Sequence, residues 1–188
     1  MQFLFYRDNY FYFPFIDSGI IVRNEMDNLL LASAYHGDID ALRYAMDHGA
    51  NIDTKDDSGY TALHWDCFKG VVGDLNNRYE IAKLLIESGA DVNSAMSEYG
   101  PSIISSACSA GNFEIVKILV ENGADVNDDR DGSSPLIEAV RTGDMDAIRF
   151  LIEHGAKPNK IDAAGETALS TALSYERFEI VNYLKNFC

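Results

Sequence analysis

Histidine and cysteine carry the most versatile side-chain chemistry near neutral pH, and this chain has four histidines and three cysteines. His48 and His154 each stand directly before a glycine, a place typical of the last turn of a helix, where the helix dipole favours a positive ring. A catalytic site needs a nucleophile with a base and an orienting group, and no such spacing is present. The chain also lacks a glycine-rich phosphate loop and a Gly-x-Ser-x-Gly turn. We therefore do not expect an enzyme.

The cysteines, Cys67, Cys108 and Cys188, are widely spaced and odd in number. Because no Cys-x-x-Cys pair occurs and no histidine accompanies them at ligand spacing, we expect neither zinc nor another cofactor. A chain of this length does not need disulfides to hold a core, so the cysteines indicate a reducing compartment. The apolar start is interrupted by Arg7, Asp8 and Pro14, which does not fit an export signal, and no stretch of about 20 apolar residues could span a membrane. We predict a cytoplasmic protein.

Carboxylates dominate the charge, since 30 Asp and Glu outnumber 15 Lys and Arg and give a formal net charge of -15. Such a surface repels phosphate backbones and anionic lipids, so we expect no binding to nucleic acid or membrane. Two acidic clusters, one at Asp53, Asp56 and Asp57 and one at Asp128, Asp129 and Asp131, lack the spaced twelve-residue calcium loop with its closing glutamate. They are either solvated loops or contacts for Lys and Arg of a basic partner, whose binding would then depend on salt.

Glycines reveal an internal repeat that must position these residues. Strings that begin Gly-Ala and end in Asn or Asp occupy residues 49–53, 89–93, 123–127 and 155–159, which gives a period of about 33 residues. A second set of glycines, Gly37, Gly70, Gly111 and Gly143, precedes them. The segment between the two glycines of each unit has apolar residues at helical spacing, and a Ser or Thr before it opens an earlier helix. Each unit therefore predicts two helices, a tight turn and a loop.

These residues resemble the ankyrin repeat, whose signature includes a Thr-Pro-Leu-His helix start, found here as 61–64, 134–137 and 167–170 in variant form, and a Gly-Ala-Asp-Val-Asn ending. The resemblance implies an all-α solenoid over residues 24–188, with finger loops and inner helices on a concave face and outer helices behind. The units are 24–55, 56–95 with an insertion at 71–77, 97–128, 129–161 and 162–188. His64 then makes hydrogen bonds within and between repeats, and Cys67 and Cys108 are small buried thiols on adjacent inner helices.

Three positions depart from the repeat in an informative way. Glu176 stands where the other units have the glycine between their helices, and Lys185 replaces an apolar residue, which suits an end unit that faces water. Asp66 occupies a slot that is small in the other units, and a buried carboxylate is costly unless it is paired. Either a backbone amide or hydroxyl of the insertion satisfies Asp66, or a partner supplies a cation.

The resemblance places the recognition surface on the fingers and inner helices. Aromatic and arginine side chains, the types enriched at binding hot spots, are frequent there, and we expect Tyr60, Trp65, Phe68 and Tyr99 to cluster near its middle unless Trp65 belongs to the core. The predicted partner-binding residues are Tyr35, His36, Asp57, Ser58, Tyr60, Trp65, Phe68, Lys69, Glu98, Tyr99, Ser109, Arg130, Asp131, Ser133, Glu138, Arg141, Glu166, Ser174 and Tyr175.

Residues 1–23 precede the repeats, and eight of the first fifteen residues are aromatic. This segment is predicted either to cover the open side of the first repeat or to act as an arm for self-association or docking. The function we expect is protein binding, in which the chain covers a basic enzyme or toxin as an inhibitor or immunity-type protein. An adaptor that bridges two proteins is the alternative.

The two interpretations of the N-terminal segment predict different effects of removing residues 1–15. A cap would expose apolar surface when it is lost, so the melting temperature would fall or the protein would aggregate. Thermal denaturation with light scattering measures both. A truncated chain that melts unchanged and loses only self-association or partner binding would contradict the cap.

Overall fold

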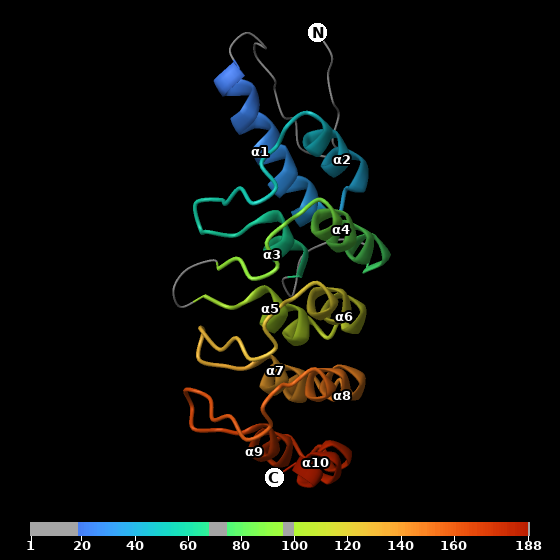
Figure 1. Cartoon of the computed structure of the whole chain (residues 1–188), viewed down its shortest axis with the longest axis vertical. Coiled ribbons are helices and arrows are strands. Elements are labelled where there is room, and N and C mark those ends of the chain that lie inside the picture. Colours follow the sequence, from blue (N-terminus) through green and yellow to red (C-terminus); the bar gives the residue numbers. More distant parts are fainter. Residues whose placement is uncertain (1–18, 68–74, 96–99, 188) are drawn as a thin grey trace.

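The computed structural model describes residues 19–67, 75–95 and 100–187 (Figure 1). Within them the secondary structure is helical, apart from an isolated antiparallel bridge between Ala95 and Ser102. The elements are α1 (Gly19–His36), α2 (Ile39–Asp47), α3 (Ala62–Cys67), α4 (Leu75–Glu87), α5 (Ile103–Ala110), α6 (Phe113–Glu121), α7 (Pro135–Thr142), α8 (Met145–Glu153), α9 (Ala168–Ser174), α10 (Phe178–Leu184) and the short 3-10 helix η1 (Lys185–Phe187).

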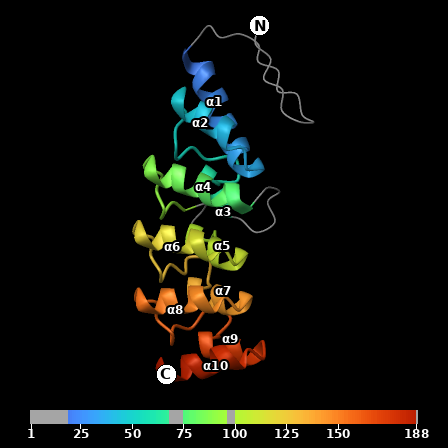
Figure 2. The ribbon, with the colours of Figure 1, turned by 90° about the vertical axis from the view of Figure 1, so that its right-hand side faces the viewer.

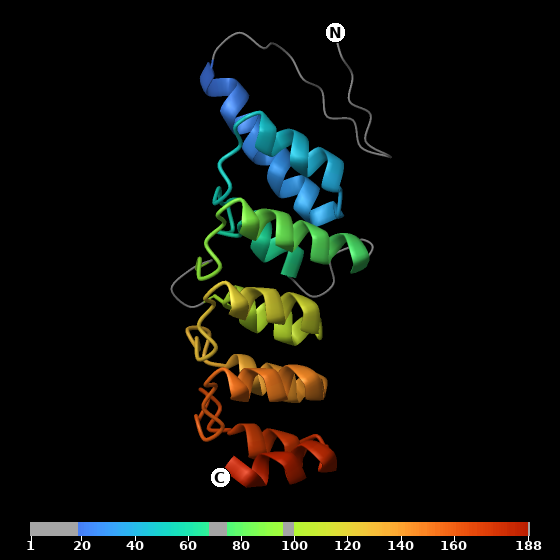
Figure 3. The same cartoon turned by 45° about the vertical axis from the view of Figure 1, so that its right-hand side comes forward.

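The helices form pairs that stack in one direction into an elongated solenoid (Figures 1 and 3). The inner helices α1, α3, α5, α7 and α9 pack on one another in that order, and the outer helices α2, α4, α6 and α8 do the same. The finger loops lie on the opposite side of the inner helices from the outer helices (Figure 1). The predicted all-α repeat solenoid is confirmed. α1 begins at Gly19 and so runs through the boundary predicted at residue 23, while residues 1–18 and the proposed cap or arm lie outside the described residues.

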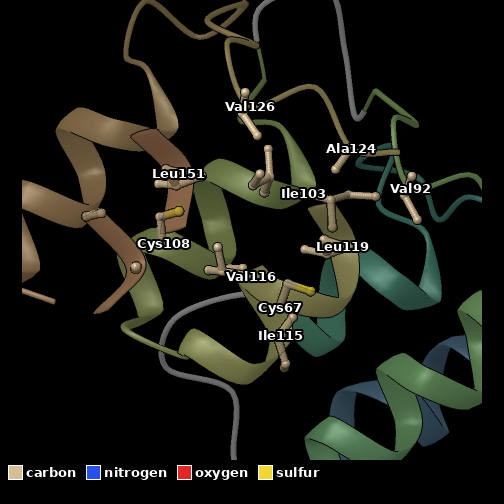
Figure 4. Close-up of a cluster of buried hydrophobic side chains, with 14 of the residues drawn as sticks. Cys67, Val92, Ile103, Cys108, Ile115, Val116, Leu119, Ala124, Val126 and Leu151 are labelled. Atoms are coloured by element: carbon tan, nitrogen blue, oxygen red, sulfur yellow. The ribbon is translucent and has the colours of Figure 1, made fainter. Parts of the chain in front are cut away.

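One apolar core runs through the stack between the two columns of helices. Leu30, Leu63, Ile104 and Leu136 stand at equivalent positions of successive inner helices, and all four are fully buried. Figure 4 shows Cys67 and Cys108 among aliphatic side chains of this core, and both thiols are free, as predicted. Burial raises the pKa of both thiols, so they stay protonated and unreactive at neutral pH.

Polar caps begin and end the helices where the sequence indicates. Ser102, Ser134 and Thr167 stand before inner helices, and each side chain accepts a hydrogen bond from a backbone amide in the first turn. His48 and His154 are the C-caps of α2 and α8, as predicted. Glu176 keeps the left-handed conformation of the glycine that it replaces, with φ 54°, and is the one such non-glycine residue in the described part of the chain.

Asparagines at the base of two fingers link their repeats to the next ones. The Nδ2 of Asn93 donates to the carbonyl of Gly123 at 2.9 Å, and its Oδ1 accepts from the amide of Asp125 at 2.9 Å. Asn127 repeats both bonds one unit later, at 3.0 Å to the Gly155 carbonyl and 3.0 Å from the Lys157 amide. One side chain thus satisfies a donor and an acceptor of the neighbouring turn, which fixes the register of the stack.

In the first repeat an aspartate takes the place of the asparagine. Asp53 accepts from the amide of Asp91 at 2.9 Å but has no N–H to offer the carbonyl of Gly89. At this position, the contact between the first and second repeats therefore has one hydrogen bond fewer than the two contacts that follow.

Asp53→Asn should supply the missing donor and raise the free energy of unfolding by about 0.5 to 1.5 kcal/mol. The reverse change, Asn93→Asp, removes the donor from an intact link and should lower it by a similar amount. Urea denaturation followed by circular dichroism measures both. If the two variants shift stability in the same direction, the asparagine bonds are not what couples the repeats.

Candidate functional site

The finger loops on the concave side are built around carboxylates. The Oδ1 of Asp56 accepts from the amides of Ser58 and Tyr60 at 2.8 and 2.9 Å. Asp162 makes the same pair of bonds in the last finger, with the amides of Ala164 and Glu166. Because one oxygen of each carboxylate accepts two backbone amides of its own turn, these bonds hold the shape of the fingers.

Three aromatic side chains gather where the finger between α2 and α3 meets the inner helices. We call Tyr35, Tyr60 and Trp65 the aromatic cluster: the Trp65 ring lies with its centroid 5.2 Å from that of Tyr35 and 4.6 Å from that of Tyr60. The indole Nε1 of Trp65 donates to the Oδ2 of Asp56 at 2.8 Å. Trp65 is half-buried against the core, whereas Tyr35 is 36% exposed. The tryptophan therefore serves both the core and the surface, and Tyr35 presents the cluster to solvent.

Arginine and lysine side chains in and beside the fingers already interact with other groups of the protein. Arg130 forms an ion pair with Asp128. Arg141 contacts both Glu138 and Asp162, and the second of these bonds, at 3.1 Å, joins one repeat to the next. Lys160 lies 2.8 Å from a carboxylate oxygen of Asp129, and Lys55 donates to the carbonyl of Ala95 at 2.6 Å.

Exposed carboxylates remain at the finger tips. Asp57 and Asp131 are both exposed, and no ion pair joins either of them to a cation in the described part of the chain. Partial burial, together with the negative charges of Glu138 and Asp128, raises the pKa of Asp131. Two finger tips therefore carry an exposed carboxylate.

The structure sorts the predicted site residues into three groups. Exposed residues at the surface are Tyr35, His36, Asp57, Ser58, Asp131, Ser174 and Tyr175; half-buried ones are Tyr60, Trp65, Ser109, Arg130, Ser133, Glu138, Arg141 and Glu166; and Phe68, Lys69, Glu98 and Tyr99 lie outside the described residues. Of the four aromatics predicted to cluster, the structure brings Tyr60 and Trp65 together and adds Tyr35. Sequence reasoning missed the role of Asp56, although an aspartate three residues before a finger glycine recurs at Asp162 and is a visible signal.

His64 is buried on α3, next to the finger between α2 and α3. Its Nδ1 lies 2.8 Å from the hydroxyl of Thr61, which confirms the predicted hydrogen bond within the repeat. Burial, helped by the positive charge of Lys55, lowers the pKa of His64 to about 4, so the ring is neutral at physiological pH.

Asp66 is a buried carboxylate that accepts no hydrogen bond from the described residues. It is 1% exposed, and neither of its carboxylate oxygens has a partner among the described residues. The donor expected from residues 71–77 is not found, and residues 71–74 lie outside the described part. A guanidinium N–H of Arg78 donates to the backbone carbonyl of Asp66 at 2.6 Å instead of to the side chain. Burial raises the pKa of Asp66 well above its ordinary value, and the charge of Arg78 only partly opposes this.

No set of three or more side chains from His, Cys, Asp and Glu gathers at metal-binding distance in the described ranges. None of the described helices is long and apolar enough to cross a membrane.

The repeat itself decides the family. A model of ankyrin repeats matches the chain in three overlapping copies, over residues 15–96, 72–162 and 104–187. This chain belongs to the ankyrin-repeat family. Because the paired helices and fingers observed here have the arrangement that the signature residues implied, the ankyrin fold prediction is confirmed.

Several curated proteins are similar to this ankyrin chain. The putative ankyrin repeat protein YahD of Escherichia coli is 27% identical over 190 residues, which cover 80% of this chain and 90% of YahD. The putative ankyrin repeat protein L371 of Acanthamoeba polyphaga mimivirus is 28% identical, and human BCL-6 corepressor-like protein 1 is also 28% identical. The matches cover 87% and 82% of this chain but only 16% and 6% of those two longer proteins.

The pKa of Asp66 predicts a pH-dependent stability that Asp66→Ala should remove. Alanine occupies the equivalent positions Ala107, Ala139 and Ala172. In the unfolded chain Asp66 ionises above a pKa of about 3.9, whereas the folded state keeps it protonated to higher pH, so native stability is lost as pH rises. Asp66→Ala should therefore stabilise by about 1 to 3 kcal/mol at pH 7.5, and the gain should shrink at pH 5.

Urea denaturation at the two pH values measures this, with Asp57→Ala as the matched control at an exposed carboxylate. The control should change stability by less than about 0.5 kcal/mol at both pH values. A loss of stability in Asp66→Ala that grows with pH would mean that the carboxylate is ionised and held by Arg78.

Proposed function

We propose that this ankyrin protein binds another protein, one with a basic surface, through its fingers and inner helices. The observation that carries the proposal is the aromatic cluster, with Tyr35 exposed, beside a finger whose tip carries the exposed Asp57. Rigid, partly exposed aromatic rings supply contact area at little cost in conformational entropy. Negative charge around them attracts a cationic partner and raises the association rate.

The cationic side chains of the fingers pair with carboxylates of the protein itself, which supports a positively charged partner. Arg130, Arg141 and Lys160 each lie within 4 Å of a carboxylate, so their charge is already compensated. A partner approaching the fingers meets the remaining carboxylates, including Asp57 and Asp131. Lysine and arginine side chains of the partner are the natural complement to such a surface.

We favour binding that covers a cationic functional site of the partner, as an inhibitor or immunity-type protein does, over catalysis. The net charge of -15 supports this, because steering toward a basic face is strongest for a strongly acidic chain. A bridging role is the alternative, and it requires a second contact surface on this chain. The free, buried Cys67 and Cys108 are compatible with a reducing, cytoplasmic setting.

A matched pair of variants tests the concave surface. Tyr35→Ala with Asp57→Lys alters the fingers and inner helices; Tyr44→Ala with Asp47→Lys makes the same changes on the outer helix α2, where Tyr44 is 40% exposed. Immobilised proteins are used to capture partners from the native lysate, with quantification by mass spectrometry. The partner retained by the unchanged protein and by the outer variant should be depleted about tenfold or more on the concave variant.

Surface plasmon resonance with the purified partner then measures the association rate and the dissociation rate of the complex separately. The association rate should fall as salt rises, because charges on the finger tips are screened. Tyr35→Ala alone should mainly raise the dissociation rate. If the outer variant loses the partner and the concave variant keeps it, the proposed surface is wrong.

A further inference from the structure

The second repeat has a carboxylic acid at a buried place where the other repeats have a small, uncharged residue. Asp66 on α3 is 1% exposed. The equivalent residues of the other repeats are also buried: Ser33, Ala107, Ala139 and Ala172. Those four side chains do not change their charge near neutral pH, whereas a carboxyl group can gain or lose a proton. The stack is therefore built around a group whose charge depends on pH.

The surroundings of Asp66 favour its neutral form. Neither carboxylate oxygen accepts a hydrogen bond from the described residues, and burial raises the pKa of the group well above its ordinary value. α1, α4 and α5 pack against α3. Among the described residues of these helices, Arg78 of α4 is the charged group that acts on Asp66, and its guanidinium donates to the backbone carbonyl rather than to the carboxylate. An ionised Asp66 is therefore better solvated in an open chain than in the closed stack.

Proton release by Asp66 is thereby coupled to opening. In an open chain the carboxyl group ionises above a pKa of about 3.9, while the closed stack keeps the proton to higher pH. Between these two pKa values the closed state binds one proton more than the open state. Its stability is complete below a pH of about 3.9 and falls as the pH rises, so the open fraction grows by up to about tenfold for each pH unit in this range.

The contacts between repeats determine how far the opening spreads. Part of a solenoid can open while the rest stays folded, because each repeat is stabilised by its neighbours alone. α1 to α4 form one end of the stack, and α5 to α10 form the remainder (Figure 2). Within α1 to α4, Asp53 lacks the N–H that an asparagine supplies to the next repeat. The later repeats keep both bonds of Asn127 and the ion pair between Arg141 and Asp162.

We propose that loss of the Asp66 proton opens the first two repeats, α1 to α4, as a unit while the three later repeats remain stacked. The fold thus contains a pH-sensitive switch. Lower pH favours the closed form, and higher pH populates a form in which the N-terminal helix pairs have separated from α5.

Two buried thiols report on the two parts separately. Cys67 follows Asp66 on α3 in the second repeat, and burial together with the charge of Asp66 raises its pKa, so it does not react while the stack is closed. Cys108 has the equivalent place on α5, and the charges of Asp144 and Glu138 act on it from the fourth repeat. Opening of α1 to α4 therefore uncovers Cys67, whereas Cys108 stays buried at the junction of the third and fourth repeats.

A consequence for binding rests on the proposed function. Trp65, next to Asp66, contacts Tyr35 and Tyr60 in the aromatic cluster, and all three belong to the part that opens. A partner bound to the cluster stabilises the closed form, so it should bind more tightly as the pH falls from 7.5 to 5.5. Thiol labelling without a partner measures the opening alone, so a failure of the proposed function and a failure of the switch are distinguishable.

Labelling of the folded 188-residue chain with N-ethylmaleimide at pH 5.5, 6.5 and 7.5, followed by peptide mass spectrometry, tests the switch. The unchanged protein is compared at each pH with Asp66→Ala and with Asp66→Asn, which keeps the shape of the side chain but cannot ionise. The labelling rate of Cys67, relative to either variant, should grow by about tenfold or more from pH 5.5 to pH 7.5. Comparison at equal pH removes the reagent's own dependence on thiolate.

The two thiols of the unchanged protein provide the internal control. After division by the rates of the urea-unfolded chain, Cys67 should label at least about tenfold faster than Cys108 at pH 7.5. Circular dichroism melts show whether the variants are folded, and if Asp66→Asn is not, Asp66→Ala decides, since alanine is native at three equivalent positions. Equal rates for Cys67 and Cys108 would mean that the chain opens only as a whole and would overturn the proposal. A Cys67 rate ratio that does not change with pH would show that Asp66 is not the switch.

Discussion

Side-by-side stacking of repeats is the interaction on which the rest of this structure depends. Each helix pair has apolar faces on both sides and can bury them only against its neighbours, so the core is a continuous column through the stack. The fully buried series from Leu30 to Leu136 traces that column along the inner helices. Asn93 and Asn127 fix the register at the base of the fingers by bonding to the next turn. The free energy of unfolding is therefore mainly a sum of contacts within repeats and between adjacent repeats.

Stacking also determines what the surface can do. Because the repeats lie in register, their fingers form a row, and residues of different repeats meet across it. Arg141 reaches Asp162 of the next repeat, and Tyr35 of the first repeat touches Trp65 of the second. The candidate surface is thus shared between repeats and requires an intact stack.

The repeat made much of the fold predictable from sequence. Glycines at a fixed period, with Ser or Thr at the helix starts, gave the helix pairs, the buried cysteines and the left-handed turn that Glu176 occupies. Side-chain partners were harder, since they depend on how distant segments meet. Arg177, at a cap position held elsewhere by Asp144, instead donates to the carbonyl of Arg141, 36 residues away. No local pattern could indicate that bond.

The same limit applies to the candidate site. Composition indicated an aromatic and acidic surface, and Tyr60 and Trp65 do lie together. It did not show that Asp56 would accept a hydrogen bond from the indole, or that the guanidinium groups of Arg130 and Arg141 would pair with carboxylates of the protein itself. Asp66 was recognised as costly, but its lack of a donor among the described residues follows only from the three-dimensional arrangement.

Hydrogen–deuterium exchange of the chain, alone and saturated with its purified partner, tests the central claim most directly. If the fingers and inner helices hold the partner, amides around Asp56 to Tyr60 and Asp129 to Ser133 will be protected, while those of the outer helices α2 and α8 will exchange as before. Protection confined to the outer helices, with the fingers unchanged, would contradict the account.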